Sequence, residues 1–220
     1  MKNFLSFLFL LINISFAENN YPIVLIHGFF GWGNTEMGNY RYWGGHKDIQ
    51  KILQDNGYKV FNVSVGPISS NWDRAVEVYY QLKGGQVDYG YGHSKKYGLI
   101  QKPVDKKYKG LYPEWDENHP VHIVGHSMGG QTARMLQYLL ETEFFEDFSN
   151  INKEKSELLG QSNMGWISSI TSLATPHDGS TLADIVTKTF PFIQYFIGLA
   201  GVVGTNFYNF DLSQWDLIRE

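Results

Sequence analysis

The sequence predicts an α/β fold with a mostly parallel β-sheet and helices on both faces of the sheet. Short apolar runs rich in branched residues, typical of buried strands, alternate along the chain with segments whose apolar residues recur at helical spacing. A glycine-rich turn joins one such run, Val121–Val124, directly to the predicted helix Gln131–Leu140. Regular alternation of strands and helices is the pattern of parallel sheets covered by helices.

The composition is that of an ordinary globular chain. Its 220 residues are 43% hydrophobic and 18% charged, which suits one domain with its own core. The formal net charge of -4 offers no basic surface, so we expect no nucleic-acid partner. Cysteine is absent, so an extracellular protein of this sequence would depend on its core without disulfides.

The N-terminus has the layout of a secretory signal peptide, residues 1–17. A positively charged start precedes an apolar run from Phe4 to Ile12, and small residues, Ser15 and Ala17, stand at the cleavage-defining positions. The run is shorter than the ~20 residues that a membrane span needs, so we expect no transmembrane anchor. The alternatives are an uncleaved anchor or a buried first helix. Cleavage would leave residues 18–220 as a secreted domain.

The first part of this domain is predicted to contain two strands and two helices. Tyr21–His27 is a continuous apolar run and predicts a buried strand. The helical spacing of Asp48–Gly57 predicts a helix, and the alternation of Tyr58–Val65 predicts a second strand. Ser69-Ser70-Asn71 is expected to cap a second helix that extends through Leu82.

The second part is less regular. Asp88–Trp115 has neither a helical nor a strand period, and its aromatic residues favour an ordered surface excursion, residues 88–115, over a linker. The predicted strand Val121–Val124 and the predicted helix Gln131–Leu140 follow it. Glu141–Asn163 is polar and is expected to be a loop with a short helix, whereas Trp166–Ala174 is predicted to be the next strand.

The pentapeptide Gly125-His126-Ser127-Met128-Gly129 fits the nucleophile elbow, G-x-S-x-G. In this motif the serine occupies a strained turn between a strand and a helix, and the glycines let the two backbones pass closely. The context agrees, because a predicted buried strand precedes the pentapeptide and a predicted helix follows it. Ser127 is therefore predicted to be a nucleophile, and a glycine-rich turn with an idle serine is the alternative.

His27-Gly28-Phe29, directly after the first strand, is the second element of the predicted site. Acyl transfer needs backbone N–H groups directed at the developing oxyanion. In hydrolases with this elbow, one N–H comes from the residue after the nucleophile, here Met128. The other comes from a loop after an early strand, and Phe29 is placed to supply it. Alternatively, His27-Gly28 merely ends the strand.

Several motifs resemble those of secreted bacterial lipases of the staphylococcal and Geobacillus type. They are PIVLIHGFFGWG, YWGG, SNWDRA, GHSMGGQTARML, ATPHDGSTL and LSQW, in order between Tyr21 and Trp215. The resemblance implies an α/β-hydrolase fold and a triacylglycerol lipase that acts through an acyl-enzyme at a lipid–water interface, with no cofactor in the chemistry. It also implies Ser127 as the nucleophile, and the amides of Phe29 and Met128 as the oxyanion hole.

The same family holds a zinc ion with two aspartates and two histidines. Asp73 and His93 match two of these ligands, whereas Leu99 and Ser213 occupy the positions of the other two. Two ligands cannot complete a tetrahedral structural site, so the sequence argues against zinc. Without a metal, Asp73 would be an acid favoured at a helix start, and His93 would be a solvated loop residue.

Residues 190–208 resemble the lid of the family. Their core, Phe190–Val203, is strongly apolar but too short for a membrane span, and its glycines suit a mobile segment. An ordinary core helix is the alternative.

The catalytic acid and base are expected to follow the serine in the order acid, then histidine. The histidine after Ser127 is His177, which the family keeps in a structural role, and we do not expect His177 and Asp178 to act together on the serine. The family draws its triad acid and base, and its calcium ligands, from a stretch that would lie beyond Glu220. We therefore expect a truncated hydrolase domain without its C-terminal strands, and calcium is left undetermined.

Three functions remain open at this point. The first is a secreted lipase or carboxylic ester hydrolase with an incomplete sequence. The second is a catalytically inactive hydrolase-fold fragment that at most binds lipid. The third is a different ester hydrolase or an acyltransferase on the same scaffold.

Overall fold

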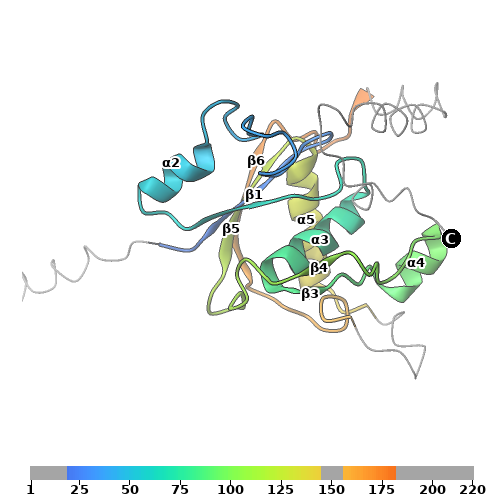
Figure 1. Cartoon of the computed structure of the whole chain (residues 1–220). Helices are drawn as coiled ribbons and strands as arrows, with labels where there is room; N and C mark the ends of the chain where they lie inside the picture. The colour runs from blue at the N-terminus through green and yellow to red at the C-terminus, as the bar shows by residue number, and fades with distance from the viewer. Residues whose placement is uncertain (1–18, 145–155, 182–220) are drawn as a thin grey trace, which may run out of the picture.

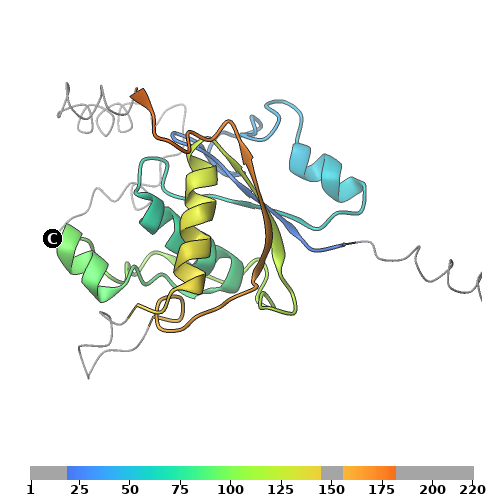
Figure 2. The ribbon, with the colours of Figure 1, turned by 180° about the vertical axis from the view of Figure 1, so that it is seen from behind.

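The computed structural model describes residues 19–144 and 156–181 (Figure 1). Within these ranges a parallel sheet carries helices on both of its faces, which confirms the predicted α/β class (Figure 2). The predicted signal peptide, residues 1–17, and the lid-like segment, residues 190–208, lie outside the described residues.

The main sheet is parallel throughout its described part. Its strands are β1 (Ile23–Ile26), β2 (Val60–Val63), β5 (Val121–His126) and β6 (Ile167–Leu173), in the order β2-β1-β5-β6. β1 lies between two strands and its last three residues are buried, which explains why its sequence is continuously apolar. β6 lies at the edge of the described sheet, and its serines and its threonine are exposed.

Two long helices cover one face of the sheet. α3 (Asn71–Lys83) and α5 (Met128–Glu141) lie against each other on this face, whereas α2 (Ile49–Asp55) lies on the opposite face (Figure 2). α3 begins where the sequence predicts, because the Ser70 hydroxyl accepts a hydrogen bond of 3.1 Å from the amide of Asp73. This cap satisfies one of the N–H groups that a helix start leaves free.

The core lies between the sheet and the pair of helices. It is built from apolar side chains of β1, β5, α3 and α5, and its largest fully buried apolar members include Trp115, Tyr79, Leu136, Leu139 and Leu140. Truncating one such leucine to alanine typically costs about 2 to 5 kcal/mol. Burial of this group therefore fixes α3 and α5 against the strands that carry the predicted site.

The segment 88–115 contains α4 (Tyr91–Tyr97) and β4 (Lys107–Tyr108). β4 pairs antiparallel with β3 (Gly85–Gln86), and Trp115 at the end of the segment is fully buried. The excursion therefore contains a helix and a strand that no sequence period revealed.

A buried ion pair fastens this segment to α3. The ammonium of Lys106 lies 2.6 Å from one carboxylate oxygen of Glu77 and 2.7 Å from the hydroxyl of Tyr89, and all three side chains are buried. The other oxygen of Glu77 accepts a hydrogen bond of 2.7 Å from the amide of Gly66. A buried carboxylate is tolerated when donors surround it in this way. Glu77 thus holds both the segment 88–115 and the loop after β2.

The start of α5 lies in close contact with β1. A β-carbon on Gly129 would lie 2.2 Å from the carbonyl oxygen of Ile26, closer than two such atoms can approach. α5 can therefore reach its observed position only with glycine at position 129.

We expect Gly129→Ala to lower the free energy of unfolding by about 3 kcal/mol, because the new methyl group must push α5 away from β1. Gly38→Ala is the matched control, since Gly38 has a φ of +55° and nothing within 4 Å of its β-carbon. The control should cost about 1 kcal/mol from backbone strain alone. Urea denaturation followed by circular dichroism measures both. Equal losses would contradict the close contact.

Candidate active site

Ser127 occupies the turn between β5 and α5. Its φ of 53° and ψ of -124° are unusual for a residue with a side chain, and such strain costs of order 1 to 3 kcal/mol and is found mainly at functional sites. Met128 begins α5 directly after it. The Ser127 side chain does not cap this helix, and within the described part of the chain its hydroxyl has no hydrogen-bond partner. The turn therefore presents the hydroxyl and leaves it free.

The two glycines of the motif make this turn possible. A β-carbon on Gly125 would lie 2.5 Å from the carbonyl carbon of Gly129, so the end of the strand and the start of the helix touch backbone to backbone. Any larger residue at either position would force the strand and the helix apart and displace Ser127.

The β1 loop, residues His27–Gly31, lies against the serine. A β-carbon on Gly28 would lie 2.8 Å from the β-carbon of Ser127. Neither the amide of Phe29 nor that of Met128 donates to an acceptor within residues 19–144 and 156–181. Free N–H groups from two segments that meet at one serine are what stabilisation of an oxyanion requires.

The β1 loop also brings apolar surface to this site. The Phe30 amide donates a hydrogen bond of 2.9 Å to the carbonyl of Pro67, and Phe30 itself has a positive φ of 53°. The rings of Phe29 and Phe30 meet edge to face at 4.6 Å and are 51% and 39% exposed. Two exposed phenylalanines beside a free serine suit an apolar substrate.

His27 is fully buried at the base of the β1 loop. Its Nδ1–H donates to the carbonyl of Gly28 at 2.9 Å, and its Nε2 accepts from the amide of Val65 at 3.2 Å. These partners assign the neutral tautomer with its proton on Nδ1. Burial, assisted by the positive charge of Arg74, lowers the pKa of His27 from 6.5 to about 3. His27 is therefore a neutral structural residue with both nitrogens occupied.

None of the seven histidines of the chain is hydrogen-bonded to Ser127, and all seven lie in the described ranges. His177 is exposed, and its Nδ1 lies 3.3 Å from the guanidinium of Arg134. The structure thus brings Ser127 together with the loop of Phe29 and with Met128, but it joins no histidine to the serine hydroxyl.

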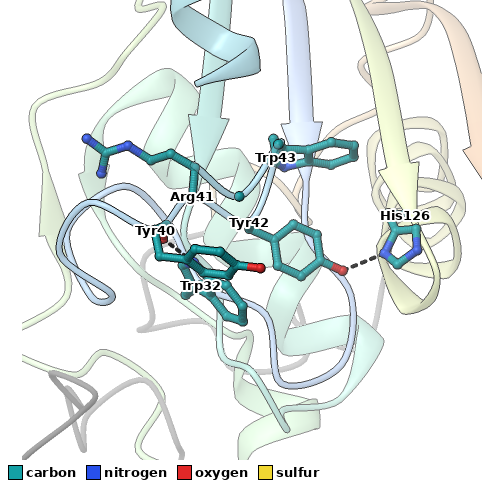
Figure 3. Close-up of a pocket in the computed structure, with 8 residues that line it drawn as sticks. Trp32, Tyr40, Arg41, Tyr42, Trp43 and His126 are labelled. Carbon is teal, nitrogen blue, oxygen red and sulfur yellow. Dashed lines mark hydrogen bonds between the residues drawn. The ribbon is translucent and has the colours of Figure 1, made fainter. Parts of the chain in front are cut away.

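A shallow pocket of about 300 Å³ opens beside this region (Figure 3). Its lining is mainly aromatic and includes Trp32, Tyr40, Tyr42, Trp43 and His126. The hydroxyl of Tyr42 lies 2.5 Å from Nδ1 of His126 and accepts the amide proton of Gly28 at 2.9 Å. The YWGG motif contains Tyr42, but no local pattern signals a bond that joins positions 42 and 126.

Asp73 and His93, the two residues that the sequence resemblance assigns to a zinc site, are bonded directly to each other. His93 Nε2 lies 2.7 Å from one oxygen of Asp73, and the Ser70 hydroxyl donates to the other oxygen at 2.6 Å. His93 lies in α4 and stacks on Trp72 with ring centroids 4.8 Å apart, so it is not the solvated loop residue expected without a metal.

These residues do not fit a closed zinc site. Among residues 19–144 and 156–181, no group of three or more histidine, aspartate or glutamate side chains is arranged to hold a metal ion. A tetrahedral structural site needs four ligands, and here each member of the pair already has the other as its partner.

Comparison with known proteins decides the family. The family model described as "Lipase-like, C-terminal domain" matches residues 19–220. The chain belongs to this lipase-like family. A relative of this lipase-like chain is Lipase 1 of Staphylococcus aureus (strain MRSA252), with 40% identity over 208 residues that cover 91% of the chain and 30% of the relative.

Solved structures place the lipase-like chain in the α/β-hydrolase fold. Lipase 1 from Pelosinus fermentans matches with a TM-score of 0.78 and 40% identity, over 92% of this chain and 55% of that chain. Staphylococcus hyicus lipase matches with a TM-score of 0.78 and 37% identity, over 86% of this chain and 49% of that chain. The lipase-like chain thus spans about half the length of these structures and 30% of the S. aureus relative.

Acid should destabilise the lipase-like fold through His27. The unfolded chain takes up a proton on this residue below pH 6.5, whereas the folded chain keeps it neutral down to about pH 3. Between these values the unfolded state binds more protons. The free energy of unfolding should therefore fall by up to about 1.4 kcal/mol per pH unit as the pH decreases through this window.

The comparison of His27→Gln with wild type in urea denaturation between pH 7 and pH 4 measures this contribution. We expect the variant to be less stable at pH 7, because it loses the hydrogen bonds of the ring, and to depend less steeply on pH. His46→Gln, which changes an exposed histidine, should keep the wild-type slope. A His27→Gln variant with the wild-type slope would contradict a neutral, buried His27.

Proposed function

We propose that this chain carries the nucleophile and the oxyanion-stabilising amides of a carboxylic ester hydrolase that acts on lipid esters. The observation that carries the proposal is the free hydroxyl of Ser127 in its strained turn, with the unbonded amides of Phe29 and Met128 in the two segments that meet there. No other serine in the described residues combines these features.

The chemistry follows from this arrangement. The Ser127 oxygen attacks the carbonyl carbon of the ester while its proton passes to a base, and the carbonyl oxygen becomes an oxyanion that accepts the two N–H groups. The bond to the alcohol then breaks, and the alcohol leaves with a proton. Water hydrolyses the resulting acyl-serine and regenerates the hydroxyl.

The base of the triad is proposed to be a residue other than the seven histidines of this chain. The acid of the triad is proposed to be a residue other than Asp178, which follows His177. The support is geometric, because His27 has both nitrogens occupied and His177 contacts Arg134. The chain spans about half of the two solved lipases, so full turnover is proposed for the longer polypeptide to which this segment would correspond.

A lipid substrate is supported by two observations. The exposed rings of Phe29 and Phe30 form apolar surface on the loop that contacts Ser127 through Gly28, and the similar proteins are named lipases. Triacylglycerols at a lipid–water interface are the substrate class that fits both.

A secreted location is proposed on the signal-peptide layout of residues 1–17. In the part of the chain that the structure describes, no helix is both long enough and apolar enough to cross a membrane.

The proposal includes no structural zinc. The direct hydrogen bond between Asp73 and His93, the stacking of His93 on Trp72 and the leucine at position 99 support a metal-free tether between α3 and α4.

Labelling of Ser127 tests the nucleophile. A fluorophosphonate probe should react with wild type, and Ser127→Ala should reduce labelling and any hydrolysis of p-nitrophenyl butyrate to background, since removal of a nucleophilic serine costs on the order of 10⁶ in turnover. Ser168→Ala, an exposed serine in β6, is the control and should label as wild type does. A longer polypeptide that contains this segment is assayed beside the 220-residue chain. Labelling of Ser127→Ala at the wild-type rate would defeat the proposal.

Metal removal tests the tether. After dialysis against EDTA, the melting temperature should stay within about 1 °C of that of zinc-supplemented protein. His93→Ala should lower the free energy of unfolding by about 1 to 3 kcal/mol, because one oxygen of the buried Asp73 carboxylate loses its partner and only the Ser70 hydroxyl remains on the other. A melting temperature that falls on chelation and returns with zinc would overturn the metal-free tether.

A further inference from the structure

The two amides of the proposed oxyanion hole belong to separate segments. Phe29 lies in the loop after β1 and Met128 in the turn after β5, and the pairing of these strands ends at Ile26 and Gly125. Beyond that pair, the backbone of residues 28–29 makes no hydrogen bond to the backbone of residues 127–128. The close backbone contact of Gly129 with Ile26 brings the two segments together, and side-chain hydrogen bonds then link them directly.

Tyr42 forms one bridge between these segments. Its hydroxyl accepts the N–H of Gly28 at 2.9 Å and lies 2.5 Å from Nδ1 of His126 (Figure 3). A tyrosine hydroxyl can accept one hydrogen bond and take part in a second at the same time, so one oxygen can bind both Gly28 and His126. Burial raises the pKa of Tyr42, which keeps the hydroxyl proton in place. The bridge thus joins the residue before Phe29 to the residue before Ser127.

Arg74 forms a second bridge from the core side. Its fully buried guanidinium donates from Nη2 to the carbonyl of His27 and from Nε to the hydroxyl of Thr132 at 2.9 Å. The Thr132 hydroxyl lies 3.1 Å from the carbonyl of Met128, one helical turn earlier in α5, and also 3.1 Å from the side-chain oxygen of Asn71. This bridge joins the base of the β1 loop to the helix that begins with the second amide.

A third bond fixes the plane of the guanidinium. Nη1 donates to the carbonyl of Gly66 at 2.7 Å, so Arg74 contacts three segments that are distant in sequence. Burial is unfavourable for this charge and lowers its pKa to about 10. Lysine could not repeat the arrangement, because an ammonium on a flexible stem lacks the rigid planar set of donors.

We infer that Tyr42 and Arg74 are positioning residues that set the separation of the Phe29 and Met128 amides, one from the pocket side and the other from the core. The inference rests on the proposed function, since it concerns the same amides. Neither residue is assigned contact with the substrate. Each acts through the backbone segment that carries one N–H group.

The test compares Tyr42→Phe and Thr132→Val with wild type. Each change removes one hydroxyl from one bridge and preserves the size of the side chain. Thr132→Val breaks the Arg74 bridge without the cavity that truncation of the buried Arg74 side chain would leave. Tyr138→Phe, which removes an exposed hydroxyl from the same helix α5, is the control. Melting temperatures establish that each variant is folded.

The first readout is acylation of Ser127 by p-nitrophenyl butyrate in a longer polypeptide that contains this segment and carries the same substitutions, measured as a burst of nitrophenolate at several ester concentrations. Loss of one oxyanion donor costs 10²- to 10³-fold, so a misplaced donor should slow acylation about tenfold, with little change in the ester concentration for half-saturation. The double variant should be slower still. A folded variant with the wild-type acylation rate would show that its bridge is merely structural.

The second readout does not depend on activity. In ¹H–¹⁵N spectra of the full chain, the amide signals of Phe29 and Met128 should shift in Tyr42→Phe and Thr132→Val but not in Tyr138→Phe. Unchanged signals in both variants would overturn the bridges even if wild type reacts. Absence of acylation in a longer polypeptide that contains this segment would instead count against the proposed function, while shifted signals would still support the bridges.

Discussion

The contact between the start of α5 and the end of β1 is the constraint on which the site depends. The helix meets the strand at backbone distance, with Gly129 against the carbonyl of Ile26 and Gly125 against Gly129. This approach leaves no room for a relaxed turn, so Ser127 is held at a positive φ. The burial of leucines along α5 supplies the free energy that offsets this strain.

Burial and one buried cation together determine the charge state of His27. Desolvation lowers the pKa of this histidine most, and the nearby charge of Arg74 lowers it further, so His27 stays neutral at physiological pH. The carboxylate of Glu77 on the same helix favours the charged form of Arg74 in return. The guanidinium therefore contributes both to the geometry of the β1 loop and to the neutrality of His27.

Local patterns in the sequence predicted the strands, the long helices and the turn at Ser127, because glycines, caps and apolar periods act over a few residues. α4 escaped prediction because its sequence, YGHSKKY, has no apolar face, and it is held by the contacts of His93 with Asp73 and Trp72. The roles of Tyr42 and Arg74 also escaped, since their partners are distant in sequence. One indication of the role of Arg74 was available in the sequence, namely that a charged residue lies among the apolar positions of α3.

The side chain of Glu77 gives the segment 88–115 a part in the site. Glu77 binds Lys106 and Tyr89 of that segment and also the amide of Gly66, whose carbonyl Arg74 holds one turn away on the same helix. A proteolytic cut within the excursion, or a substitution that displaces Lys106 or Tyr89, would leave the buried carboxylate of Glu77 without these two hydrogen-bond donors. Because Glu77 and Arg74 both bind Gly66, and Arg74 also binds the carbonyl of His27, a shift of Glu77 would change the position of the β1 loop beside Ser127. The excursion thus stabilises the site from a distance.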